Sequence, residues 1–156
     1  MKKNRILLLW SMLLSVLFIG LASKSSPLYP MNDWVDVNCF FTMGRGILDG
    51  LVPYRDLYEQ KGPVLYFVYA IIALFSEDSY AGVYLLEVVT FGLFLYYSGK
   101  LAQLYAGASK VVYLLVAILA AAVVTSWSFT HGGSVEQHSL FMLVYAMFSV
   151  LSALKE

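Results

Sequence analysis

The stretch Gly62–Phe75 reads GPVLYFVYAIIALF, and its length decides how the chain can be arranged in a membrane. Proline is favoured in the first turn of a helix, so the Gly62-Pro63 pair predicts a helix start. A helix over residues 63–75 would be about 20 Å long at about 1.5 Å per residue. That is short of the roughly 30 Å of hydrocarbon that a transmembrane helix crosses. The sequence therefore predicts a juxtamembrane helix over 63–75 rather than a span.

The rest of the chain has the composition of an integral membrane protein. Of its 156 residues, 60% are hydrophobic and 13% are charged, which is more apolar than a soluble domain of this size. Four further apolar runs approach the length of a transmembrane helix: residues 6–22, 80–98, 111–129 and 140–154. We expect an all-α integral membrane protein with four transmembrane helices. Its first outer loop, 24–79, would hold juxtamembrane helices at 34–48 and 63–75.

The distribution of charge predicts the orientation. If 63–75 does not span, one side of the membrane receives six basic residues: Lys2, Lys3, Arg5, Lys100, Lys110 and Lys155. The other side receives four basic residues and most of the acidic ones: Asp33, Asp36, Asp49, Asp56, Glu59, Glu77, Asp78 and Glu136. If 63–75 did span, Lys100 and Lys110 would move outside and Glu136 inside. The first arrangement follows the positive-inside rule, and it predicts a cytoplasmic N-terminus and an extracytoplasmic acidic loop.

The N-terminal run has a second interpretation. Basic residues followed by an apolar core and Leu21-Ala22-Ser23 also fit a secretory signal peptide. Because the run 6–22 is longer than the usual apolar core of about 7–15 residues, we favour an uncleaved membrane anchor.

Charge and cysteine content exclude two classes of site. The chain carries ten basic and ten acidic side chains, so it offers no basic surface for a nucleic acid. Cys39 is its single cysteine, which excludes an internal disulfide and a cysteine-based metal cage.

Asp36 is the first candidate for chemistry in the polar segment 33–63. Apolar side chains follow it at helical spacing: Phe40, Met43, Ile47 and Leu48. This spacing predicts an amphipathic helix at the membrane surface, where Asp36 could act on a substrate with a lipid tail and a polar head. The alternative is structural. If Asn32 or Asp33 caps the helix, Asp36 is its third residue, where free amides and the helix dipole favour a carboxylate.

A longer pattern runs through this loop: an aspartate, an aromatic residue, glycines, a proline, and Tyr-x-x-Lys-x-Pro entering an apolar helix. Its residues are Asp36, Phe40, Gly44, Gly50, Pro53, Tyr58, Lys61 and Pro63. The pattern resembles the first extracytoplasmic loop of C-type glycosyltransferases, in the polyprenyl- or dolichyl-phosphate-sugar mannosyltransferase-like family that includes bacterial aminoarabinose transferases. Val37 stands where that family usually has an acidic residue, and Lys61-Gly62-Pro63 replaces Lys-Pro-Pro. The resemblance covers roughly residues 5–150.

The resemblance implies transfer of a sugar from a polyprenyl-phosphate donor to an acceptor in the cell envelope. It implies that Asp36 is the general base, and that Glu136, after the third span, helps to organise a metal and the donor phosphate. Asp36 and Glu136 are suitable ligands for a divalent cation such as Mg²⁺ or Mn²⁺. Lys61, Arg55 and Tyr58 are the candidate substrate-binding residues, and the first two could stabilise a departing phosphate.

Each of these residues also has a structural interpretation. Arg55 can pair with a neighbouring carboxylate, and Lys61 can extend along a helix start toward the interface. Glu136 can be the N-terminal acid of a helix that Ser134 caps. These alternatives compete directly with the phosphate and metal roles.

Three other polar residues receive no catalytic role from the sequence. His131 and His138 do not have the spacing of a zinc enzyme, so we interpret them as interfacial histidines. Glu87 lies within the predicted span 80–98, where a carboxylate is costly. No basic partner for it is apparent in the spans, and it stays unassigned.

We expect a membrane glycosyltransferase, or the N-terminal part of one, because members of the family typically have many more spans. The resemblance therefore does not imply that this length of chain is active alone. The alternative is a non-catalytic membrane scaffold or assembly partner with an acidic outer loop. A small transporter subunit is a third possibility, which depends on Glu87 alone.

Overall fold

The computed structural model describes residues 2–76, 78–107, 109–129 and 131–155. In this part of the chain it has six helices and no strand: α1 (Lys2–Ala22), α2 (Val35–Leu48), α3 (Pro63–Phe75), α4 (Ala81–Ala106), α5 (Lys110–Val124) and α6 (Val135–Ala153). The expected all-α fold is confirmed. Glu77, which was counted in the outer acidic set, lies outside the described residues.

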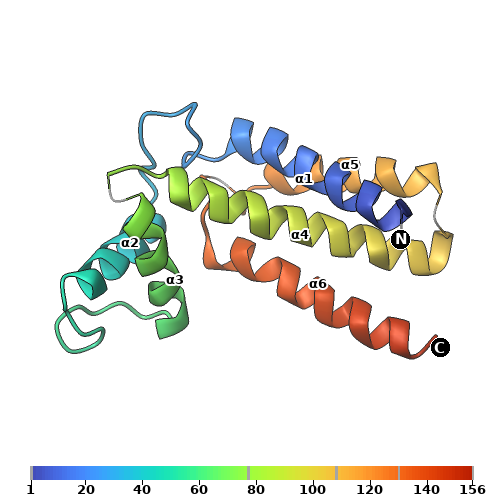
Figure 1. Ribbon diagram of the computed structural model, residues 1–156. Helices are drawn as coiled ribbons and strands as arrows, with labels where there is room; N and C mark the ends of the chain where they lie inside the picture. The colour runs from blue at the N-terminus through green and yellow to red at the C-terminus, as the bar shows by residue number, and fades with distance from the viewer. Residues whose placement is uncertain (1, 77, 108, 130, 156) are drawn as a thin grey trace.

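Four helices form a bundle, and the other two lie at one end of it. Figure 1 shows α1, α4, α5 and α6 running side by side, with α2 and α3 gathered where α4 and α6 begin. α4 is central, since it packs against α1, α5 and α6, while α2 packs against α3. α1 begins and α6 ends at the far end of the bundle (Figure 1). The loop after α1 and the loop after α5 therefore share one end of the molecule.

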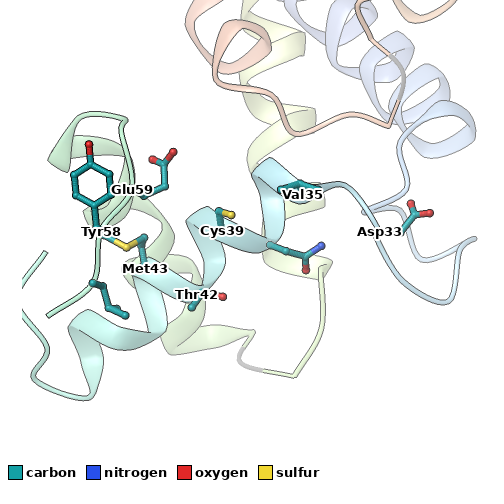
Figure 2. A pocket seen from close by; sticks show the side chains of 9 residues that line it. Asp33, Val35, Cys39, Thr42, Met43, Tyr58 and Glu59 are labelled. Atoms are coloured by element: carbon teal, nitrogen blue, oxygen red, sulfur yellow. The ribbon is translucent and has the colours of Figure 1, made fainter. Parts of the chain in front are cut away.

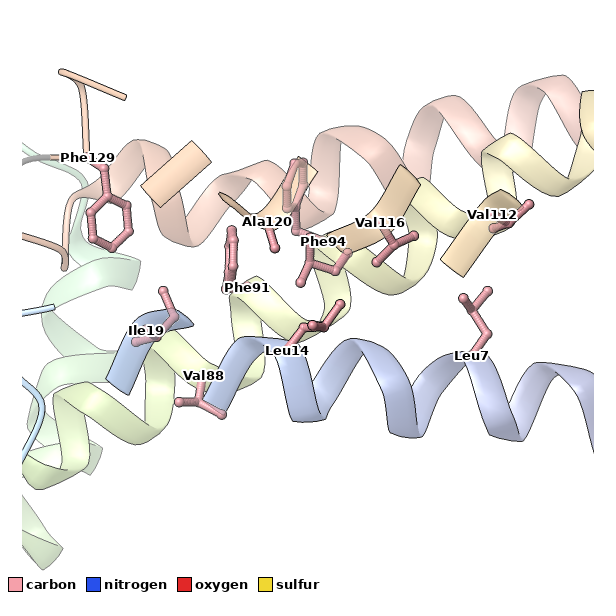
Figure 3. Close-up of a cluster of buried hydrophobic side chains, with 11 residues drawn as sticks. Leu7, Leu14, Ile19, Val88, Phe91, Phe94, Val112, Val116, Ala120 and Phe129 are labelled. Atoms are coloured by element: carbon pink, nitrogen blue, oxygen red, sulfur yellow. The ribbon is translucent and has the colours of Figure 1, made fainter. Parts of the chain in front are cut away.

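The bundle core is apolar with a few polar ties. Figure 3 shows Leu7 and Leu14 of α1, Phe91 of α4 and Val116 of α5 within one cluster of buried side chains. Ser15 is buried beside this cluster, and its hydroxyl donates a 2.7 Å hydrogen bond to the carbonyl oxygen of Val88 on α4. Small hydroxyl side chains at such contacts are typical of helices that pack in a membrane.

Two helices in the described part of the chain are long and apolar enough to cross a bilayer: Asn4–Ala22 and Ala81–Ala106. α3 and α5 are shorter apolar helices. The two long helices favour an association with a membrane, by length and composition.

The ends of α5 and α6 differ from the expected spans 111–129 and 140–154. α5 ends at Val124, where the hydroxyls of Thr125 and Ser126 donate to carbonyl oxygens of its last turn at 2.8 and 2.6 Å. Such bonds compete with continued helix. α6 begins earlier than expected, at Val135, because the Ser134 hydroxyl accepts a hydrogen bond from the backbone N–H of Gln137. Ser134 is thus the helix cap that the sequence suggested.

α2 and α3 form a second, smaller core. Phe40 and Phe41 of α2 and Tyr66 and Tyr69 of α3 are buried in it. The backbones approach closely, since a Cβ placed on Gly44 would lie 2.5 Å from the carbonyl carbon of Tyr69. The expected helices 34–48 and 63–75 therefore exist, and they pack on each other.

The outer side of α3 carries an apolar stripe. Its members are exposed by 55 to 75%: Val64, Phe67, Ile71 and Leu74. Because they recur at three- and four-residue spacing, they lie along one side of the helix. The residues buried against α2 lie on the opposite side. An exposed apolar stripe on a short helix is typical of a helix in a membrane interface.

Candidate functional site

Two of the charged residues singled out from the sequence, Lys61 and Glu136, meet where the loop before α3 approaches the start of α6. The Nζ atom of Lys61 lies 4.0 Å from Oε1 of Glu136. Lys61 stands two residues before α3, and Glu136 lies in the first turn of α6. The Lys61 side chain is 32% exposed and that of Glu136 75%. The structure thus brings two predicted site residues together at the surface.

The backbone around Lys61 is held by Glu59 and two tyrosines. Oε2 of Glu59 accepts hydrogen bonds from the Lys61 N–H at 2.8 Å and from the Tyr66 hydroxyl at 2.5 Å. The hydroxyls of Tyr66 and Tyr54 lie 2.8 and 2.6 Å from the Lys61 carbonyl oxygen. Burial raises the pKa of the Glu59 carboxyl, but these hydrogen bonds and the Lys61 charge outweigh it and leave that pKa below its ordinary value. An ionised Glu59 therefore positions Lys61.

Asp36 is half-exposed in the first turn of α2. The N-cap of this helix is Trp34, not Asn32 or Asp33. The reason is that Asn32 is buried in the preceding loop, where its Oδ1 accepts from the Trp34 N–H and its Nδ2 donates to Ser25, both at 2.9 Å. Asp36 is consequently the second helical residue rather than the third, still within reach of the free amides of the helix start.

Tyr69 connects the Asp36 helix with α6. Its ring is buried, and its hydroxyl lies 3.5 Å from Nε2 of His138. Burial raises the pKa of the Tyr69 hydroxyl, and the carboxylates of Glu87 and Asp36 raise it further. The hydroxyl therefore stays protonated, with the charge of Asp36 on one side and the first turns of α6 on the other.

The turn before α6 packs directly on the start of α2. The rings of His131 and Trp34 stack with centroids 5.1 Å apart and an interplanar angle of 11°. Nε2 of His131 lies 3.8 Å from Oδ1 of Asp33. Gly133 adopts a φ of 77°, and a Cβ on it would clash with Val37 of α2. Only glycine fits such a position readily, so the glycine at this turn lets α6 begin beside α2.

Among the described residues, Glu87 lies beside neutral polar groups and not beside a basic one. It is fully buried in α4, and its Oε2 lies 3.4 Å from Nε2 of Gln137. A Cβ on Gly132 would lie 2.6 Å from the same oxygen and 2.6 Å from the hydroxyl of Ser23. Glu87 thus joins the end of α1, the turn before α6 and α6 itself. His138, interpreted from the sequence as interfacial, is buried nearby.

Arg55 and Tyr58 have different surroundings. The Arg55 guanidinium donates two hydrogen bonds to the Asp56 carboxylate, at 2.9 and 2.6 Å, and is 70% exposed. This pair lowers the pKa of the Asp56 carboxyl. Tyr58 is 83% exposed and lines a pocket of about 390 Å³ together with Cys39 and Glu59 (Figure 2). The structure therefore gives Arg55 the neighbouring partner that the sequence suggested.

The residues missed by sequence reasoning are Glu59, Tyr66 and Tyr69. Glu59 appeared only as a possible partner of Arg55, and the tyrosines read as part of an apolar run. The available signal was the three-residue spacing of Tyr66 and Tyr69, which puts both on the buried side of α3. A buried tyrosine hydroxyl usually requires a polar partner, which predicts a polar group opposite each one.

A metal role for Asp36 and Glu136 remains a prediction. No group of three or more His, Cys, Asp or Glu side chains that could hold a metal ion occurs in the described parts of the chain. Mg²⁺ commonly uses only one or two carboxylates together with substrate phosphates, and two acidic residues are compatible with that mode.

Comparison of the chain with protein-family models, curated proteins and solved structures gave no match. The glycosyltransferase family therefore remains a resemblance of the loop pattern. Function is therefore inferred from the geometry of the residues that the fold brings together.

Proposed function

We propose that the chain is a membrane glycosyltransferase, or the N-terminal part of one, that transfers a sugar from a polyprenyl-phosphate donor to an extracytoplasmic acceptor hydroxyl. The observation that carries the proposal is the Lys61–Glu136 pair at 4.0 Å. Lys61 stands two residues before α3, which packs on α2, the helix that carries Asp36. A lysine at a lipid boundary is suited to a phosphate, and a half-exposed carboxylate is suited to accept a proton.

An apolar groove is suited to the lipid chain of the proposed donor. It has a volume of about 410 Å³ and lies between α3, α4 and α6. Val64 and Val135 line it, close in sequence to Lys61 and Glu136 respectively. A polyprenyl chain in this groove would place its phosphate beside the ammonium group of Lys61.

In the proposed reaction, the acceptor oxygen forms a bond to the anomeric carbon while Asp36 takes the hydroxyl proton. The bond between that carbon and the donor phosphate oxygen breaks, and its electron pair leaves with the phosphate. Lys61 stabilises the charge that develops on the phosphate, and Glu136 holds the ammonium group in place. A bound Mg²⁺ or Mn²⁺ would add to this stabilisation.

The proposed topology places this chemistry outside the cytoplasm. α1, α4, α5 and α6 would all cross the membrane, with the N-terminus cytoplasmic. Because α5 has only 15 residues, its assignment as a span rests on the charge pattern and not on its length. α3 would lie in the outer interface with its apolar stripe against lipid. This arrangement keeps the positive-inside pattern of the sequence.

The test is Asp36→Asn in membranes that contain the protein, assayed with a panel of polyprenyl-phosphate hexoses. Loss of a general base typically costs about 100-fold or more in rate. We therefore expect transfer to fall by at least that factor, with polyprenyl-phosphate binding unchanged. Asp49→Asn, at the exposed C-cap of the same helix, is the matched control and should transfer normally.

Two results would contradict the proposal. Retained transfer by Asp36→Asn would remove Asp36 as the base. If the unaltered protein neither bound polyprenyl phosphate nor transferred a sugar, the chain would fit the non-catalytic scaffold instead.

A further inference from the structure

A second pocket lies along α2. It is an open pocket with a volume of about 390 Å³, lined by α2, by Asp33 just before it and by the loop that precedes α3 (Figure 2). Cys39 and Thr42 line it from α2, and they lie on one side of the helix because of their spacing. Tyr58 and Glu59 line it from the loop. None of these side chains lines the donor groove. Glu59 is shared with the Lys61 segment, since it accepts a hydrogen bond from the Lys61 N–H.

The charged groups of the pocket are all acidic. Asp33 stands at one end with its side chain 67% exposed, and Glu59 stands in the loop wall. No lysine or arginine is among the described residues that line the pocket. An anionic ligand would meet like charges there, which is costly at an interface. Hydroxyl groups would find carboxylate oxygens that can only accept hydrogen bonds.

The pocket also offers apolar surface. Tyr58 is 83% exposed, and Met43 and Leu57 line the wall beside it. An exposed tyrosine presents an apolar ring face and a polar tip. A sugar ring has the complementary surfaces, with C–H groups on its faces and hydroxyls at its edge.

The proposed base does not line the pocket but lies on the helix that forms one of its walls. Met43 lies seven residues after Asp36 on α2, and a seven-residue separation is close to two helical turns. Asp36 therefore lies on the same side of α2 as one wall of the pocket. A molecule bound there would extend a hydroxyl toward that carboxylate.

We propose that this pocket binds the acceptor, and that the acceptor is an uncharged polyhydroxylated molecule, such as the sugar end of a glycan, and not an anion. The identification of the bound molecule as the acceptor rests on the proposed function. The binding and its charge selectivity do not depend on it, and they can be measured without any transfer reaction.

The native Cys39 provides the measurement, because it is the only cysteine of the chain and lines the pocket. The experiment compares the rates at which a cationic and an anionic methanethiosulfonate reagent modify Cys39. Each rate is divided by the rate at which the same reagent modifies a small thiol in solution. We expect the cationic reagent to react several-fold faster, since attraction to each nearby carboxylate is worth on the order of 1 kcal/mol. Asp33→Asn together with Glu59→Gln should abolish the preference.

Protection by ligands is the second measurement. Neutral mono- and oligosaccharides of glucose, mannose and galactose should slow the modification of Cys39, while glucuronate and galacturonate at equal concentration should not. The inference is overturned if no neutral sugar protects, if the uronates protect equally well, or if the anionic reagent reacts as fast as the cationic one. Protection without any transfer would dismiss the proposed function and keep the pocket. Transfer without protection would dismiss the pocket and keep the proposed function.

Discussion

At the scale of single residues, two basic side chains of one loop pair with carboxylates in different places. Arg55 is tied to the adjacent Asp56, whereas Lys61 reaches Glu136 on a distant helix. The sequence could propose both for phosphate binding but could not separate them. The difference depends on which groups the fold brings near each side chain.

Lys61→Ala should weaken the binding of polyprenyl phosphate by about tenfold, equivalent to about 1.4 kcal/mol. Arg55→Ala should change it by less than twofold, because exposed pairs such as Arg55–Asp56 contribute little and lie outside the groove. The measurement is equilibrium binding of labelled polyprenyl phosphate to the protein in nanodiscs. Equal losses in the two variants would contradict the assignment of Lys61.

Glu59 should make the loop sensitive to acid. The pKa of Glu59 is lower in the folded protein than in the unfolded chain. Its ionisation therefore stabilises the fold at pH values above the ordinary glutamate pKa of about 4.3. This contribution is lost as the pH falls through the lower, folded value. The stability difference between the wild type and Glu59→Gln should therefore be present at pH 7 and vanish in strong acid, as measured by thermal unfolding in detergent.

Tyr66→Phe tests the same contact from the other side. It removes the hydroxyl that lies 2.5 Å from Glu59, and loss of a hydrogen bond to a charged group costs about 1.5–3 kcal/mol. The variant should lose stability at pH 7 and show a smaller pH dependence than the wild type. A wild-type pH dependence in Tyr66→Phe would contradict the role given to this bond.

At the scale of helices, the sequence predicted the bounds of a helix where residues with special backbone properties, such as glycine and proline, mark its ends. Gly62-Pro63 marks the start of α3, and the observed bounds Pro63–Phe75 agree with the expected 63–75. α5 stops early, at Val124, because of hydroxyl side chains that hydropathy does not count. The partners of the α3 tyrosines were also missed. Tyr66 contacts Glu59 and Lys61 through a loop that folds back on the helix, and Tyr69 contacts His138, which is distant in sequence.

The close approach of α2 and α3 gives a prediction for Gly44. A Cβ there would lie 2.5 to 2.8 Å from backbone atoms of Tyr69 and Ala70, which cannot move as a flexible side chain can. Gly44→Ala should therefore destabilise the pair by about 1–3 kcal/mol, the usual cost of overpacking. The measurement is the thermal midpoint together with the rate of proteolysis in the loop 49–62.

Gly62→Ala is the matched control for Gly44→Ala. No atom lies within 4 Å of a Cβ built on Gly62, so this variant should unfold and be cleaved like the wild type. If Gly44→Ala behaved as Gly62→Ala does, α2 and α3 would have to lie farther apart than the structure places them.

At the scale of the whole molecule, the site depends on two loops meeting at one end of the bundle. The segment between α1 and α4 contacts the start of α6 and the turn before it, through Trp34 with His131 and through Lys61 with Glu136. The positive-inside pattern predicted this shared end, whereas the individual contacts required the fold. Apolar side chains on the outside of the bundle, such as Leu9 and Leu143, are exposed by 70% and 61%, which suits a lipid surrounding.

Cysteine labelling in intact cells tests the shared end. With Cys39→Ser as background, Ser79→Cys before α4 and Ser128→Cys after α5 should both react with a membrane-impermeant maleimide, because both loops lie at the proposed outer end (Figure 1). Ser109→Cys, between α4 and α5 at the opposite end, should react only after the membrane is permeabilised. Labelling of Ser79→Cys without Ser128→Cys from outside would put Lys61 and Glu136 on opposite sides of the bilayer. The site could then not form, whatever the loop pattern resembles.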